Sequence, residues 1–231
     1  MSRGCQSCTS PPALPFSREH PAQKYESGIL LWLISPGCAF DLESLETLHF
    51  AVLSRLDARL FGLMKTLFET VFPPLKSFSW SLPGPAHDVD EWLIPLKRAS
   101  SRLENVSKLT IAVEDYSPAS SVPWIPDFLQ HLPHPDKLRE VIIPVTFQRW
   151  VYLEDIRESW DHLGILFSSQ TSLSFSSLRR LHIGLWVRVG GENTEKDIRK
   201  FLSFTFCDLD EKGILKITRS ECPGYIYARD C

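Results

Sequence analysis

The sequence predicts an α/β solenoid in which a curved parallel sheet forms one face and helices form the other. A pattern Leu-x-x-Φ-x-Φ, where Φ is apolar, recurs along the chain at steps of 30 to 40 residues. Within each copy the apolar residues alternate with a period of two, as in a strand with one buried side. Between copies the apolar residues are three or four apart, as in an amphipathic helix. Strand, helix and strand at this repeat length place neighbouring strands parallel, with the helices along one side.

Six copies of the pattern predict six strands. Their first residues are at positions 45, 75, 106, 138, 178 and 212, which gives steps of 30, 31, 32, 40 and 34. The sixth copy has Lys212 in the first, normally apolar, slot. The copies are Leu45–Leu48–Phe50, Leu75–Phe78–Trp80, Val106–Leu109–Ile111, Leu138–Val141–Ile143, Leu178–Leu181–Ile183 and Lys212–Leu215–Ile217.

Apolar stripes predict a helix in each interval between these strands. The stripes run over residues 53–71, 89–103, 125–132, 156–167 and 198–205. The last helix also has a start signal, Thr194-x-x-Asp197, which approximates a capping box and places its beginning at Thr194. Prolines such as Pro73 and Pro133 fall at the junctions, where a residue without a backbone N–H ends a helix or begins a turn.

The repeats divide the chain into three parts. Residues 1–24 are rich in Ser and Pro and have no periodic apolar positions, so we expect a flexible leader. Residues 25–220 form the predicted solenoid, and residues 221–231 form a tail.

Charge and composition exclude several kinds of partner. The 231 residues include 25 Lys and Arg against 28 Asp and Glu, a net charge of −3, and the cations are scattered. This distribution gives no broad field for nucleic acid or for an anionic membrane. The longest apolar run, Ile29 to Ile34, is far shorter than the roughly 20 residues of a spanning helix. Without a secretory signal, the expected location is intracellular, cytoplasmic or nuclear.

The sequence contains no recognisable catalytic, cofactor-binding or metal-binding motif. Asp208-x-Asp210-x-Lys212-Gly213 opens like a calcium loop, but Lys212 and Arg219 occupy two of the ligand positions, where cations repel the ion. The nucleophile elbow of serine hydrolases and the glycine-rich loops of nucleotide sites are absent. We therefore expect no catalytic residue, no metal and no cofactor, and predict that the protein is not an enzyme.

Several segments resemble a known family. Each unit looks like a long, irregular leucine-rich repeat, and three segments resemble the carboxy-terminal repeat region of fungal F-box-type proteins. These segments are residues 40–48 (FDLESLETL), 177–183 (SLRRLHI) and 213–217 (GILKI).

In that family an F-box docks the Skp-type linker of a cullin ubiquitin ligase, and the repeats hold a client protein. Here Leu14-Pro15-Phe16 does not continue into the apolar helical module of an F-box. The resemblance therefore implies ligase docking only if an F-box lies outside this chain.

The fifth copy provides the candidate contact surface. Alternate residues of each strand point away from the helices, and in the first two copies these residues are small. The fifth copy instead offers Arg180, His182, Trp186 and Arg188 on one strand, and Trp and Arg are the residue types that dominate interface hot spots. We predict that these four residues bind a partner. The alternative is that Trp186 packs against the loop that follows it.

These observations predict a non-enzymatic protein–protein interaction module with an unknown protein client. Two alternatives stay open. The chain could be a truncated gene product without independent function, because the first repeat has no evident polar cap. It could also be an enzyme whose site is assembled from scattered residues that no motif exposes.

Overall fold

The computed structural model describes residues 45–51, 66, 75–82, 103–115, 124–147, 153–168, 175–187 and 191–219. The predicted leader and tail lie outside these residues, as do most of the predicted helix over 53–71 and almost all of the one over 89–103. The described strands are β1 (Thr47–Ala51), β2 (Ser77–Leu82), β3 (Lys108–Asp115), β4 (Glu140–Phe147), β5 (Arg180–Val187) and β6 (Leu215–Arg219). The described helices are α4 (Trp124–Gln130), the 3-10 turn η2 (Pro135–Lys137), α5 (Leu153–Phe167), α6 (Gly191–Thr205) and α7 (Cys207–Glu211).

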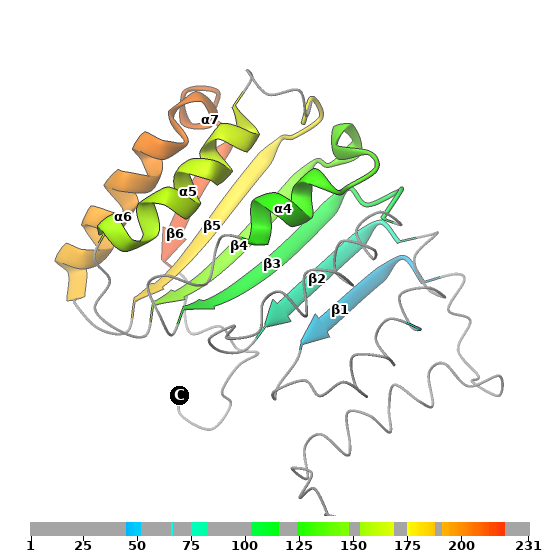
Figure 1. Cartoon of the computed structure of the whole chain (residues 1–231), viewed down its shortest axis with the longest axis horizontal. Helices are drawn as coiled ribbons and strands as arrows, with labels where there is room; N and C mark the ends of the chain where they lie inside the picture. The colour runs from blue at the N-terminus through cyan, green and yellow to red at the C-terminus, as the bar shows by residue number, and fades with distance from the viewer. Residues whose placement is uncertain are drawn as a thin grey trace, which may run out of the picture.

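The strands form one six-stranded sheet in the order β1-β2-β3-β4-β5-β6, and every pairing is parallel. The strands therefore lie side by side in chain order with α4 and α5 across the front of the sheet (Figure 1). The predicted α/β class with a parallel sheet is confirmed. All six predicted strands are present, including the one in the copy with Lys212 in its first slot.

The register aligns the same slot of every copy. Second-slot residues are paired from strand to strand along the row Leu48, Phe78, Leu109, Val141, Leu181 and Leu215. Parallel neighbours in register place like positions side by side, so the apolar slots of successive copies share one face of the sheet. The first-slot residues from Leu75 to Leu178 are buried just before their strands.

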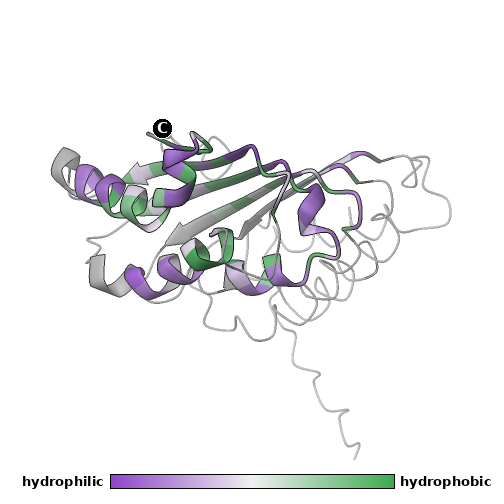
Figure 2. Cartoon of the chain, turned by 90° about the horizontal axis from the view of Figure 1, so that it is seen from above, coloured by the Kyte–Doolittle hydropathy of each residue, from purple (hydrophilic) through white to green (hydrophobic). Residues whose placement is uncertain are grey.

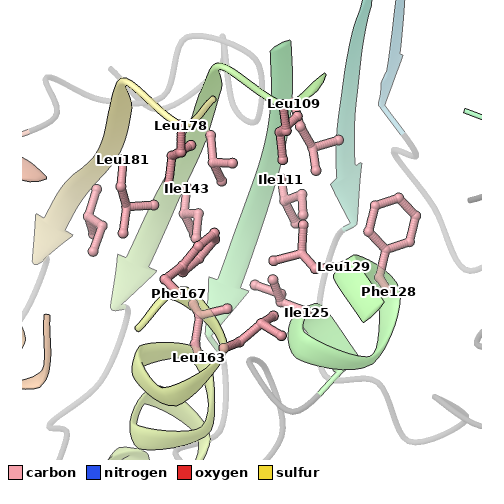
Figure 3. Close-up of a cluster of buried hydrophobic side chains, with 14 of the residues drawn as sticks. Leu109, Ile111, Ile125, Phe128, Leu129, Ile143, Leu163, Phe167, Leu178 and Leu181 are labelled. Atoms are coloured by element: carbon pink, nitrogen blue, oxygen red, sulfur yellow. The ribbon is translucent and has the colours of Figure 1, made fainter. Parts of the chain in front are cut away.

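One hydrophobic core joins this face to the helices. Figure 3 shows Leu163 and Phe167 of α5 and residues of α4 directed toward β3 and β4. Trp160 of α5 is fully buried and its ring meets that of Phe206 edge-on, with 6.1 Å between centroids. Hydrophilic and hydrophobic residues alternate along the helices in Figure 2, as expected for helices with one buried side. The core residues of α4, α5 and α6 belong to a single cluster with those of the strands.

Pro144 lies in the middle of β4, a position that sheets rarely tolerate because proline has no N–H to donate. Pairing between β4 and β5 runs unbroken through Pro144 and Gly184. Pairing between β3 and β4 instead passes from Thr110–Ile142 to Val113–Val145 and skips two positions. The missing donor is therefore on the β3 side, and the sheet accepts the proline as a local gap in one ladder.

The start of α6 differs from the prediction. The capping-box pattern placed the start at Thr194, whereas the helix begins at Gly191 and contains Thr194 in its first turn. Glu195 then has Arg199 four residues ahead, and the Arg199 Nη2 to Glu195 Oε1 distance is 2.7 Å. This i, i+4 ion pair stabilises the amino-terminal half of the helix and is compatible with either start.

The segment that resembled a calcium loop forms the end of α7. Gly213 has φ 66°, its N–H donates to the Asp210 carbonyl, and the N–H of Ile214 donates to the Leu209 carbonyl. These two bonds and the left-handed glycine form a Schellman motif, which closes a helix C-terminus. The motif turns the chain directly from α7 into β6.

Arg199 joins α6 to the last strand. Its Nη1 donates to the carbonyl oxygen of Ile217 at 2.8 Å, while Glu195 holds the other side of the guanidinium. Glu195 also lies near Arg219, with 3.7 Å between Oε2 and Nε. The contact therefore ties the helix layer to the strand farthest from β1.

Gly164 of α5 allows α5 and α6 to approach closely. A Cβ at this position would lie 2.7 Å from the Thr205 carbonyl oxygen and 2.8 Å from Thr205 Cγ2. The first of these is a backbone atom, so relief requires movement of a helix end rather than a side-chain rotation.

We expect Gly164→Ala to destabilise the fold by about 1–2 kcal/mol, because overpacking costs about 1–3 kcal/mol and alanine returns up to about 1 kcal/mol of helix propensity. Urea unfolding at 25 °C measures the difference. His162→Ala, at an exposed position of the same helix, is the control and should not destabilise. A Gly164→Ala protein as stable as the original would show that the helices are not in close contact.

Candidate functional site

The side of the sheet opposite the helices is formed by the alternate strand positions, and we call it the open face. Its residues are half-buried or exposed at most positions, in contrast to the buried residues between them. The burial patterns of β4 and β5 alternate accordingly over their first four residues. The open face carries Thr47, His49, Ser77, Ser79, Lys108, Thr110, Ala112, Glu140, Ile142, Pro144, Thr146, Arg180, His182, Gly184, Trp186, Lys216 and Thr218.

Three of the four predicted contact residues lie on this face in β5. Arg180 is exposed, and His182 and Trp186 are half-buried. The fourth, Arg188, lies outside the described residues. The structure therefore brings Arg180, His182 and Trp186 onto one surface, as the alternation predicts.

Exposure decreases along the strands from their amino-terminal ends. Lys108, Arg180 and Lys216 are exposed near the starts of their strands. Toward the other end, Gly184 and Thr146 are buried, although they belong to the open face. Thr146 is the register partner of Trp186, which is itself half-buried. The amino-terminal half of the open face is therefore more accessible than the part around Trp186.

An ion-pair ladder crosses the accessible half. Glu140 Oε1 is 2.9 Å from Arg180 Nη1, and Glu140 Oε2 is 3.3 Å from Lys108 Nζ. The carboxylate thus links β3, β4 and β5 through one oxygen to each side. Lys76 and Glu46 form a similar pair between the residues just before β2 and β1.

His182 lies between this ladder and the last strand. Its Nε2 is 2.7 Å from Thr218 Oγ1, and its register partner is Lys216. Partial burial lowers the pKa of His182 below 6.5, and the positive charges of Lys216 and Arg180 lower it further, while Glu140 acts in the opposite direction. The imidazole is therefore neutral at pH 7.

Lys216, Thr218 and Glu140 were not among the predicted contact residues. Lys216 and Thr218 occupy the open-face positions of the sixth copy, and Glu140 occupies the first open-face position of the fourth. The same alternation that selected Arg180 and His182 identifies these three, once it is applied to every copy.

Two further histidines follow α4 in the part of the chain that the structure describes. His131 and His134 are exposed, and His131 Nδ1 lies 2.7 Å from the carbonyl oxygen of Asp127 in its own turn. Among the described residues no group of three or more His, Cys, Asp or Glu could hold a metal ion. No described helix is long and apolar enough to cross a membrane.

Comparisons with protein-family models, with curated proteins and with solved structures find no match to this chain. The assignment of a role therefore depends on the geometry of the open face.

The lowered pKa of His182 makes stability depend on pH. The unfolded chain binds a proton at His182 near pH 6.5, whereas the folded protein binds it only at lower pH. Between these two values the unfolded state carries more protons, so stability is lost as the pH falls below about 6.5.

We expect Lys216→Gln to raise the pKa of His182, because the substitution removes a nearby positive charge. NMR titration of the imidazole resonances measures this pKa in the folded protein. The control Lys200→Gln, at an exposed position of α6, removes the same charge elsewhere and should leave the His182 titration unchanged. An identical His182 pKa in the original and Lys216→Gln proteins contradicts the assigned cause.

Proposed function

We propose that the chain is a non-enzymatic protein-interaction module in which leucine-rich-repeat-like units form a solenoid and bind a protein client through the open face. The observation that carries the proposal is the in-register row of six repeats, whose alternate positions are left on a surface that no described helix covers. Repeats that stack only on their neighbours form extended surfaces of this kind, and such surfaces serve recognition.

The residue types on the open face support recognition rather than catalysis. Arg180 and Trp186 belong to the classes that supply most binding energy in protein interfaces. The small residue Ala112 lies on the same face, is half-buried and allows close approach of a partner.

The role resembles client recognition in F-box-type ubiquitin-ligase adaptors. On this view the chain supplies only the part that holds the client. Contact with a Skp-type linker and a cullin then requires an F-box outside this chain.

Capture of binding partners tests the proposal. The purified chain is used to pull down proteins from a fungal cell lysate, with Trp186→Ala and Phe204→Ala as paired variants. Phe204 lies on α6 in the helix layer and is 81% exposed, so its removal matches the loss of an aromatic side chain on a different surface. Bound proteins are identified by mass spectrometry, and their affinities are then measured with purified components.

We expect Trp186→Ala to weaken the captured client by about 30-fold, the effect of a hot-spot residue worth about 2 kcal/mol, and Phe204→Ala to leave it unchanged. Recovery of Skp and cullin subunits would extend the role to ligase docking. Loss of the client in Phe204→Ala but not in Trp186→Ala would place the binding surface on the helices and overturn the proposal.

The same samples address the two alternatives. A chain that binds the dye ANS, lacks near-ultraviolet circular dichroism and captures nothing is a truncated product without a packed core. A well-packed chain that captures no protein but turns over a small molecule is an enzyme. Either result rejects the interaction module.

A further inference from the structure

The accessible half of the open face has an excess of positive charge where β3, β4, β5 and β6 begin. The exposed cations there are Lys108, Arg180 and Lys216, and the described acidic side chain among them is Glu140. Three positive charges and one negative charge leave an excess of 3 − 1 = 2. This excess contrasts with the chain as a whole, which carries −3.

Glu140 is already engaged on both oxygens and neutralises only part of the charge of this surface. Its two contacts, at 2.9 Å to Arg180 and 3.3 Å to Lys108, use one oxygen each. Arg180 keeps its side chain 58% exposed, and a guanidinium has five N–H groups of which this contact uses one. Lys216 on the next strand is exposed as well. Arg180 and Lys216 therefore present donors to solvent on either side of His182.

We propose that Arg180, His182 and Lys216 form a binding surface for an extended acidic segment of the protein client. This inference rests on the proposed function, because it names the chemistry of the partner at the same open face. Charge complementarity selects the occupant, since two exposed cations next to a neutral, hydrogen-bonding imidazole suit carboxylates.

The spacing of these side chains suits a segment with acidic residues at alternate positions. Lys216 of β6 is in register with His182 of β5. Arg180 lies two residues before His182 in β5 and is therefore a diagonal neighbour of Lys216. Diagonal neighbours on adjacent strands are about 7–8 Å apart. Alternate residues of an extended chain are about 7 Å apart and point to the same side. Two carboxylates of one extended segment can therefore pair with Arg180 and Lys216 together.

An acidic peptide fits this surface better than nucleic acid. Tight binding to a phosphate backbone requires many cations to release counterions, and the surface offers three on a chain of negative net charge. Burial lowers the pKa of His182, and the charges of Lys216 and Arg180 lower it further, while Glu140 raises it. An anion bound beside it should reverse part of this effect, and the change can be observed directly.

The probe is an eight-residue peptide of alternating Glu and Thr with blocked ends, compared with the same peptide carrying Gln or Lys in place of Glu. Binding to the full chain is followed by NMR at low salt, from the backbone resonances of β5 and β6 and the imidazole resonances of His182. Lys216→Glu reverses one charge of the surface, and Lys200→Glu makes the same change at an exposed position of α6.

We expect the Glu peptide to shift resonances of β5 and β6, to raise the pKa of His182 and to lose affinity as salt is added. Lys216→Glu should weaken binding by about 2–5-fold, the range for exposed charge pairs, and Lys200→Glu should leave it unchanged. Equal binding of the Gln or Lys peptide, or equal loss in Lys200→Glu, overturns the proposal. Tighter binding of an eight-residue oligothymidine at the same resonances also overturns it, in favour of nucleic acid.

The result separates the two proposals. A client that depends on Trp186 but binds Lys216→Glu normally leaves the interaction module intact and rejects the acidic segment. Specific binding of the Glu peptide by a chain that captures no client supports the chemistry of the surface and rejects the proposed function.

Discussion

The structure depends on one constraint, the alignment of equivalent repeat positions across all six parallel strands. In each strand the residues that face the helices must be apolar, and the register places them beside their counterparts. A slip of one residue would turn the apolar row outward, so core packing fixes the register. Truncation of a fully buried residue such as Leu181 therefore disturbs both its own strand and the strands on either side.

The same constraint leaves the open face variable, because its residues contribute little to the core. This explains how the sheet accepts Gly184, which has no side chain to pack, beside Pro144 in central strands. It also explains why the character of the face changes across the sheet, from Thr47 and Ser77 on the first strands to Arg180 and Lys216 on the last. The residues at one end of this face can thus change without loss of the fold.

The strands were predictable because their signal is repeated. Each copy alone is a short apolar pattern, but six copies at similar steps define both the elements and their pairing. Helix limits were less predictable, since Thr194 is a residue type that caps helices yet lies within the first turn of a helix that begins at Gly191. The relation of Lys216 to His182 depends on register between β5 and β6, which single-strand alternation does not contain.

The contact of Arg199 with Ile217 affects whether a strand of another molecule can pair with the outer edge of β6. The N–H of Leu181 donates to the Ile214 carbonyl, so the carbonyl of Ile214 faces β5. Backbone N–H and C=O groups of successive strand residues point to opposite sides, and the carbonyl of Ile217 therefore faces outward. Outward carbonyls at a sheet border are templates for an additional strand from another molecule. The guanidinium of Arg199 already occupies this acceptor and places a charged group beside it. A helix side chain thereby occupies an outward acceptor of β6 and disfavours pairing of this strand with a strand of another molecule.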